Sequence, residues 1–250
     1  MSVRILLCEG PDDIAALREL GTWLLGASVT RIPASAGAAG QERKSALTTK
    51  SNHRVDLIAA SGKSKLPDRV ATLLATLSPQ VPGDPEETSD IGVVFDPDGG
   101  DPDVDFLPAV EAAIAAGAPG WTLSKGSGSW LAQRAVAERV NVHFLPWRGT
   151  TDPFDGLGAE QSLERLLCSI GSAAYPAEAK LVESWLDAFP STRKRTWKSA
   201  VHLWCALVES DQNEATAPTR FLHQNKECKP HVRPLLERLG LLEPLRPLFE

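Results

Sequence analysis

Two short stretches of this 250-residue chain place carboxylates directly after apolar runs. In the first, the run Val3–Cys8 is followed by Glu9 and, four residues further on, by Asp13. In the second, the run Ile91–Phe95 is followed by Asp-Pro-Asp at 96–98. Carboxylates that converge on one point stay ionised only when a cation lies among them, and their hard oxygens select Mg²⁺ or Mn²⁺ over zinc.

A metal ion held in this way can polarise a phosphate, activate a water molecule and stabilise a leaving oxygen. The pattern therefore points to phosphoryl transfer or phosphodiester cleavage. A purely structural interpretation stands beside it: Asp13 is also placed to cap a helix, and the run FDPDGGDPD at 95–103 has an ordinary turn composition. The presence of two such stretches, each reading as strand, acid and helix, favours the metal site.

The elements that must position these residues alternate between strands and helices up to about residue 146. Short apolar runs predict strands at Val3–Cys8, Val29–Ile32, Val55–Ala59, Ile91–Phe95, Trp121–Ser124 and Val140–Leu145. Helical spacing predicts helices after the first strand, at Pro67–Leu77, at Val104–Ala116 and before the last strand. Residues 33–54 and 78–90 are predicted to be connections. Alternation of this kind predicts parallel strand pairing and a fold of the α/β class.

After Pro146 the sequence shows only helical periodicity. Four apolar faces are predicted, on Leu163, Leu166, Leu167 and Ile170; Val182, Trp185, Leu186 and Phe189; Trp197, Val201, Trp204 and Val208; and Val232, Leu235, Leu236 and Leu239. We therefore expect an α/β domain over residues 1–150 and a helical C-terminal domain over residues 151–250.

The two acidic stretches together resemble the signature of the TOPRIM domain, which topoisomerases, bacterial primases, recombination-repair proteins and several nucleases share. The matching residues are Glu9-Gly10-Pro11-Asp12-Asp13 and Asp96-Pro97-Asp98. The resemblance implies a Rossmann-like parallel sheet flanked by helices. It also implies that Glu9 is a general acid/base or a metal ligand, that Asp13 belongs to the catalytic signature, and that Asp96 and Asp98 are Mg²⁺ ligands.

The C-terminal half is similar to small stand-alone bacterial TOPRIM proteins related to the overcoming-lysogenisation-defect nucleases. Those proteins carry a glutamate in an L-E-x-L-L segment and a lysine on a later helix. The candidates in this chain are Glu164, within 163–167, and Lys198, within 197–200. By this resemblance Glu164 completes a second metal site and Lys198 neutralises charge on the transition-state phosphate. The alternative is a solvated glutamate on an amphipathic helix and a basic surface lysine.

Two further residues are candidates for contact with phosphate. Gly10 forms the turn that lets a backbone or a phosphate come close. Lys63 lies in Ser-Gly-Lys-Ser at 61–64, which resembles the end of a phosphate-binding P-loop, but Leu57 stands where that motif requires glycine. A Walker ATPase is therefore rejected. Lys63 still follows a strand on the side of the acids, so it is either a phosphate contact or an ordinary loop lysine.

The composition narrows the class of protein. A net charge of −6 argues against a surface covered with basic residues for binding nucleic acid, although basic stretches occur at 42–54 and 193–198. The chain has no apolar run of about 18 residues, which predicts no membrane span. Its four cysteines form no C-x-x-C pair, which argues against structural zinc and favours a cytoplasmic setting.

Three functions are compatible with the sequence. The first is a nuclease that uses Mg²⁺ or Mn²⁺ to cleave DNA or RNA. The second is a non-catalytic TOPRIM module that binds nucleic acid or a partner ATPase. The third is phosphoryl or nucleotidyl transfer to a small substrate. Topoisomerase activity is excluded because the chain is too short for a strand-gating domain, and primase activity because no zinc-binding segment is present.

Overall fold

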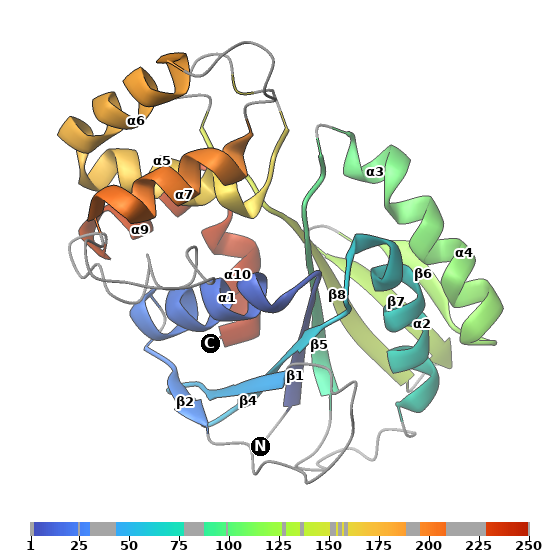
Figure 1. Cartoon of the computed structure of the whole chain (residues 1–250). Coiled ribbons are helices and arrows are strands. Elements are labelled where there is room, and N and C mark those ends of the chain that lie inside the picture. The colour runs from blue at the N-terminus through green and yellow to red at the C-terminus, as the bar shows by residue number, and fades with distance from the viewer. Residues whose placement is uncertain are drawn as a thin grey trace, which may run out of the picture. The chain divides into compact units, whose positions relative to one another are not determined.

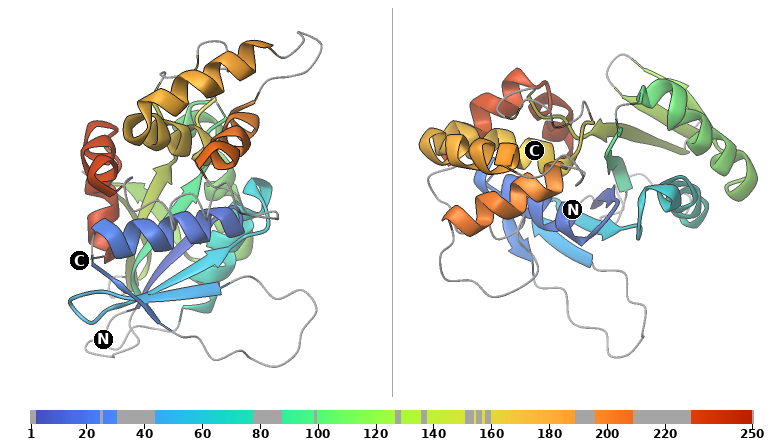
Figure 2. Two further views of the ribbon diagram at one scale, coloured as in Figure 1. Left: turned by 60° about the vertical axis from the view of Figure 1, so that its left-hand side comes forward. Right: turned by 45° about the horizontal axis from the view of Figure 1, so that its top comes forward.

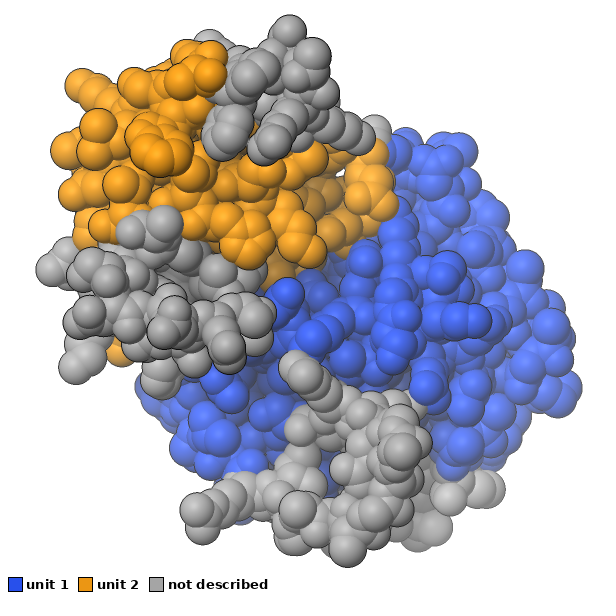
Figure 3. All heavy atoms as spheres, viewed as in Figure 1, with its two compact units in different colours: residues 1–95, 100–146, 243–250 blue, residues 96–99, 147–242 orange. Residues whose placement is uncertain are grey.

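The computed structural model describes twelve stretches of the chain, which are residues 3–24, 26–30, 44–77, 88–98, 100–126, 129–135, 138–150, 154, 157, 160–188, 196–208 and 229–249 (Figure 1). The chain divides into two compact units, coloured separately in Figure 3. Unit 1 contains residues 1–95, 100–146 and 243–250, and unit 2 contains residues 96–99 and 147–242.

Unit 1 is built on an eight-stranded mixed sheet, so the fold is of the α/β class. The strands are β1 (Val3–Cys8), β2 (Ser28–Thr30), β3 (Lys44–Thr48), β4 (Arg54–Ala59), β5 (Thr88–Phe95), β6 (Thr122–Lys125), β7 (Trp130–Ala135) and β8 (Glu138–Pro146). Their order across the sheet is β2-β3-β4-β1-β5-β8-β7-β6. The four central strands, β4, β1, β5 and β8, are parallel, whereas the outer strands on both sides pair antiparallel.

The register of the central strands defines two edges of this sheet. Cys8 lies opposite Ala59 on one side and Val94 on the other, and Val94 lies opposite Leu145. The central strands therefore end side by side, at what we call the carboxyl edge, and begin side by side at the amino edge. Because β6 is related to β8 by two antiparallel steps, β6 runs in the same direction as the central strands, whereas β3 runs in the opposite direction and ends at the amino edge. The strand β6 stops three residues short of the carboxyl edge, since its last residue pairs through Trp130 and Val142 with the level of Ile91 rather than Val94.

Helices cover both faces of the sheet in unit 1 (Figure 2). They are α1 (Pro11–Leu24), the 3₁₀ turn η1 (Lys63–Lys65), α2 (Leu66–Thr76), α3 (Pro102–Asp105), α4 (Leu107–Gly117) and the end of α10 (Leu242–Phe249). One core joins α2 and α4 to the sheet through Ile5, Leu7, Val70, Leu74, Ile91, Val93, Val110 and Ile114. On the other face α1 and α10 pack closely. A Cβ on Gly92 of β5 would lie 2.7 Å from Leu248, and one on Gly21 of α1 would lie 2.5 Å from Phe249.

Unit 2 is helical in its described part. Its helices are α5 (Leu163–Ala174), α6 (Pro176–Ala188), α7 (Trp197–Val208) and α9 (Lys229–Arg238), and α5 packs against each of the others. The buried side chains include Leu166, Leu167, Ile170, Val182, Leu186, Trp197, Val201, Trp204, Val232, Leu235 and Leu236, which confirms most of the predicted apolar faces. The prediction that Trp185 belongs to a buried face is wrong, because its side chain on α6 is 59% exposed. Phe189 lies outside the described residues.

Several predicted elements need correction. The sheet is not wholly parallel, since only its four central strands are. Residues 33–54 are not simply a connection, because β3 occupies Lys44–Thr48; residues 31–43 lie outside the described part. The helix predicted before the last strand is the strand β7. A short apolar segment such as Trp-Leu-Ala is compatible with a helix or a strand, and it forms a strand here because it pairs with β8.

The remaining differences concern boundaries. The helix predicted at Val104–Ala116 is two helices, α3 and α4, separated at Phe106. The connection predicted at 78–90 overlaps β5, which begins at Thr88, and residues 78–87 are outside the described part. The predicted domain boundary at 150 assigned all of 151–250 to the helical part, whereas the division by contacts places residues 243–250 with the sheet. Among the described residues, no helix is long and apolar enough to cross a membrane.

Candidate metal and phosphate site

Glu9, Gly10 and Asp13 lie where β1 ends and α1 begins. Gly10 precedes Pro11, the first residue of α1, and its N–H donates a hydrogen bond to Asp13 Oδ2 at 2.8 Å. A carboxylate that reaches back from the third helical position to the capping residue forms one half of a capping box. Asp13 is only 7% exposed. The predicted capping role of Asp13 is therefore confirmed, and its predicted catalytic role stays a prediction.

The turn that contains Lys63 is fastened to the residue that follows β1. Ala60 N–H donates to Cys8 O at 2.7 Å, and Gly62 N–H donates to Glu9 O at 2.8 Å. Gly62 has a φ of 117°, a backbone conformation that favours glycine. Lys63, which is half-buried, begins η1 directly after this glycine. Unit 1 thus brings Glu9, Gly10, Asp13 and Lys63 together at the carboxyl edge of its sheet.

The buried thiol of Cys8 reports the electrostatics of this edge. Burial raises the pKa of Cys8, and the negative charges of Asp13 and Glu9 raise it further. The thiol lies 3.5 Å from each of the carbonyl oxygens of Gly10 and Ile58. Both carboxylates are therefore close enough to the end of β1 to act on the buried thiol.

Asp96 belongs to unit 2 and lies at the start of α5. Its Oδ1 accepts a hydrogen bond from Leu163 N–H at 2.9 Å, and Leu163 is the first residue of α5. The capping residue is Ser162, whose hydroxyl accepts from Arg165 N–H at 3.3 Å. The positive end of a helix dipole favours an ionised carboxylate. Glu164 is the next residue of α5 and is half-buried, so Asp96 and Glu164 are both associated with one helix N-terminus.

Asp98 and Lys198 are the other predicted site residues in unit 2. Asp98 is exposed and has a φ of 53°, in the left-handed region that aspartate tolerates better than most residues. Lys198 is exposed in the first turn of α7, which Thr196 caps by accepting from Ser199 N–H at 3.2 Å. The Arg165 guanidinium lies 5.1 Å from the ring centroid of Trp197, the residue before Lys198. The starts of α5 and α7 are therefore neighbours.

Arg165, which the sequence did not single out, joins these parts of unit 2. It is 2% exposed and donates from Nε to Thr150 O at 2.9 Å and from Nη1 to Glu160 O at 3.1 Å. Burial lowers the pKa of Arg165, and the charge of Glu160 opposes this shift. A Cβ on Gly149 would lie 2.6 Å from Arg165, so the segment after β8 needs glycine there. No periodicity could have identified this arginine, because it flanks the apolar face of α5.

The predicted residues therefore form two sets. Unit 1 holds Glu9, Gly10, Asp13 and Lys63; unit 2 holds Asp96, Asp98, Glu164 and Lys198. Within the described stretches, no group of three or more His, Cys, Asp or Glu side chains is placed to hold a metal ion. The two sets are connected through the chain, because Asp96 directly follows Phe95, the last residue of β5. Strand β5 is in turn the neighbour of β1, which Glu9 follows.

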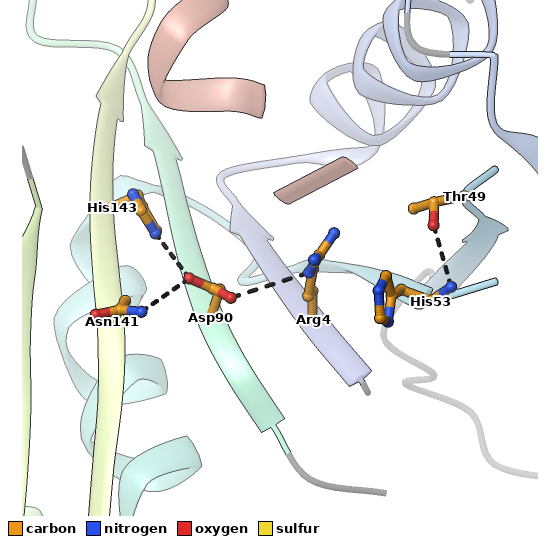
Figure 4. A network of polar contacts seen from close by, with 6 residues as sticks. All are labelled: Arg4, Thr49, His53, Asp90, Asn141 and His143. Atoms are coloured by element: carbon orange, nitrogen blue, oxygen red, sulfur yellow. Dashed lines mark hydrogen bonds and ion pairs between the residues drawn. The ribbon is translucent and has the colours of Figure 1, made fainter. Parts of the chain in front are cut away.

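A second group of polar side chains lies at the amino edge of the sheet (Figure 4). Asp90 Oδ1 lies 3.0 Å from His143 Nε2 and accepts from Asn141 Nδ2 at 3.2 Å, while Asp90 Oδ2 lies 3.9 Å from Arg4 Nε. Asp90 and His143 are 8% and 7% exposed. The sequence placed Asp90 in a surface connection, which is wrong: β5 begins two residues before it.

Comparison with known proteins identifies the fold and no function. No family model matches the chain, and no curated protein matches it. A crystal structure of a hypothetical protein from Pyrococcus horikoshii OT3 is similar, with a TM-score of 0.68 and 16% sequence identity over 100% of each chain. At this identity the likeness shows a shared fold alone, and it extends over both units.

Proposed function

We propose that this protein is a TOPRIM-type nuclease that uses Mg²⁺ or Mn²⁺ to hydrolyse phosphodiester bonds in DNA or RNA. One observation carries the proposal: β1 and β5 are adjacent parallel strands in the register Cys8 with Val94, and an acid follows each of them. Glu9 and Asp96 thus leave the sheet from the same edge. In open α/β sheets ligands bind outside the carboxyl ends of the strands, where these acids stand.

The donor set fits a hard divalent cation. Glu9, Asp96, Asp98 and Glu164 offer carboxylate oxygens, and Mg²⁺ needs only one or two carboxylates together with waters and substrate phosphate oxygens. The Leu163 amide at 2.9 Å favours the ionised form of Asp96, which is the form that binds metal. When bound, the metal supplies an activated water and a polarised phosphate.

The chain's own residues then divide the remaining work. Glu9 would take a proton from the attacking water or give one to the leaving oxygen. Lys63, beside Glu9, and Lys198, at the start of α7, would meet negative charge on the phosphate. Gly10 would leave room for the phosphate. The space beside it is open, because a Cβ added to Gly10 would meet its nearest neighbour, Asp13 Oδ2, at 3.7 Å.

The test is a Mn²⁺-supplemented cleavage assay on single- and double-stranded DNA and RNA. Glu9→Gln and Asp96→Asn should abolish cleavage while the proteins remain folded, as thermal unfolding would verify. Asp96→Asn is the sharper probe, because the amide oxygen can still accept from Leu163 N–H while the charge is lost. Glu111→Gln, on the exposed side of α4, is the matched control. Cleavage that survives both site substitutions would sink the assignment.

A non-catalytic module that binds nucleic acid or a partner ATPase is the second candidate. It is favoured by the structural roles of two predicted site residues, since Asp13 and Asp96 each accept a hydrogen bond at a helix N-terminus. Calorimetry distinguishes the two functions. Absence of Mg²⁺ or Mn²⁺ binding, even with an oligonucleotide present, would favour the module.

A further inference from the structure

A third group of side chains in unit 1 belongs to the turn end of the hairpin of β6 and β7. Lys125 is the last residue of β6 and lies opposite Trp130, the first residue of β7. Gly126 N–H donates to Ser129 O at 2.8 Å at the turn end of the hairpin. Trp130 lies opposite Val142 of β8, which lies opposite Ile91 of β5, so both residues pair three residues short of the carboxyl edge. The Lys125 ammonium lies 3.0 Å from Asp103 of α3, the first helix after β5. The sequence predicted a strand at Trp121–Ser124 and a loop over 124–130, and it assigned no role to Lys125.

Lys125 is presented to solvent on a fixed aromatic support. Its side chain is 64% exposed, and its ammonium lies 5.7 Å from the ring centroid of Trp130 and 3.0 Å from Asp103 Oδ2 of α3. Trp130 is half-buried and packs edge-on against Phe144 with ring centroids 6.1 Å apart. An exposed ion pair contributes only about 0–1 kcal/mol, so Lys125 can exchange Asp103 for a phosphate at little cost.

Basic side chains lie on both sides of β1, and therefore of Glu9, across the sheet. The strand order places η1, with Lys63 and Lys65, beyond β4 on one side of Glu9, and the β6–β7 hairpin on the other side. Neighbouring strands lie about 4.8 Å apart, so the four steps from β1 to β6 cover roughly 19 Å. Phosphates along one strand of a duplex are about 3.4 Å apart along its axis, so roughly six nucleotides span this distance.

We infer that the β6–β7 hairpin is a binding surface for the phosphate backbone of a nucleic-acid strand, with Lys125 as its main contact. This inference deepens the proposed function and rests on it for the position of the bond that is cut. It specifies the substrate as a polymer, because a mononucleotide held near Glu9 cannot reach Lys125. Asp103 competes with the phosphate for Lys125, so its removal should strengthen binding.

Fluorescence anisotropy with labelled single strands of about four and about twenty nucleotides tests the inference, since only the longer strand exceeds the span estimated above. All proteins carry Glu9→Gln and Mg²⁺ is present, so that the strand survives. The longer strand should bind more tightly than the shorter one. Lys125→Ala should weaken binding of the longer strand by roughly fivefold and reduce the slope of log Kd against log salt by about one. Asp103→Asn should change the affinity in the opposite direction.

The matched control is Lys50→Ala, an exposed lysine in the turn after β3, at the amino edge of the same sheet. It should leave the affinity unchanged. The inference is overturned if Lys125→Ala alters neither affinity nor salt slope, or if both strands bind equally. A wild-type protein that fails to cleave, yet binds the long strand through Lys125, would refute the nuclease and keep the surface. Cleavage by the wild-type protein, together with binding that Lys125→Ala leaves unchanged, would support the nuclease and refute the binding surface.

Discussion

At the amino edge of the unit 1 sheet Asp90 is surrounded by side chains, whereas at the carboxyl edge Asp13 is held by a backbone amide. Arg4, Asn141 and His143 all lie within 3.9 Å of Asp90. Asp13 accepts from Gly10 N–H, and together with Glu9 it still acts electrostatically on Cys8. The same sheet therefore surrounds one buried carboxylate with polar side chains, including the Arg4 guanidinium, and holds another through the backbone at its other edge.

This contrast distinguishes a structural cluster from the proposed ligand site. A buried charge that carries its own counter-charge and hydrogen bonds serves the fold, because no ligand is needed to keep it ionised. The carboxylates at the carboxyl edge stand where open α/β sheets bind ligands. We therefore expect substitutions at the amino edge to change stability alone, and substitutions at the carboxyl edge to change metal-dependent activity.

The largest expected effect belongs to Glu9. Glu9→Gln removes the proposed proton acceptor and should lower the rate of Mn²⁺-dependent cleavage by about 100-fold or more. The free energy of unfolding, measured by urea denaturation, should stay close to that of Glu111→Gln. A large loss of stability in Glu9→Gln would contradict the expectation that acids at the carboxyl edge affect activity and not stability.

Asp90→Ala should have the next largest effect and should act on stability. Removing one partner of a buried ion pair leaves the buried Arg4 guanidinium uncompensated, which typically costs about 3–5 kcal/mol. Denaturant unfolding should show a loss of about 3 kcal/mol, with Mg²⁺ affinity by calorimetry unchanged. If Asp90→Ala abolishes metal binding in protein that is still folded, the amino edge is more than structural.

The pH dependence of stability gives a smaller, related effect. Burial acts to raise the pKa of Asp90, but the hydrogen bonds led by that from His143 outweigh it and lower this pKa below 3.8. A lowered carboxyl pKa contributes stability that is fully present above 3.8 and is lost as the pH falls below that value. The stability gap between wild type and Asp90→Asn should therefore narrow on acidification from about pH 6 to about pH 3. A constant gap would show that the charge of Asp90 is irrelevant to folding.

The sequence predicts the centre of the fold better than its margins. The side chains of residues 5–8 are all buried, so consecutive residues pack on both faces of the sheet, and strand β1 was predicted with its observed bounds, Val3–Cys8. The margins depend on pairing. In β3, Ala46 and Leu47 supply the buried side chains, and such a short, small-residue segment becomes a strand because β4 pairs with it. Local sequence does not contain that information.

The site shows the same division between local and distant contacts. The bond between Gly10 and Asp13 spans three residues, and a helix start is readable from such spacing. The bond between Asp96 and Leu163 spans 67 residues and depends on tertiary structure. Asp90 was misassigned for the same reason, because its partners Asn141 and His143 are 51 and 53 residues away. Acids whose partners are distant in sequence resemble surface acids until the fold is known.

Asp13 gives the smallest expected effect and the most direct test of a dual role. Asp13→Ala removes the acceptor for Gly10 N–H and should lower the free energy of unfolding by about 1 kcal/mol. Asp13→Asn keeps an acceptor oxygen and should recover most of that loss. If Asp13 only caps α1, Asp13→Asn will also retain metal-dependent cleavage. If the carboxylate belongs to the catalytic group as well, Asp13→Asn will be stable but inactive, because an amide can cap a helix but cannot supply the negative charge that a metal requires.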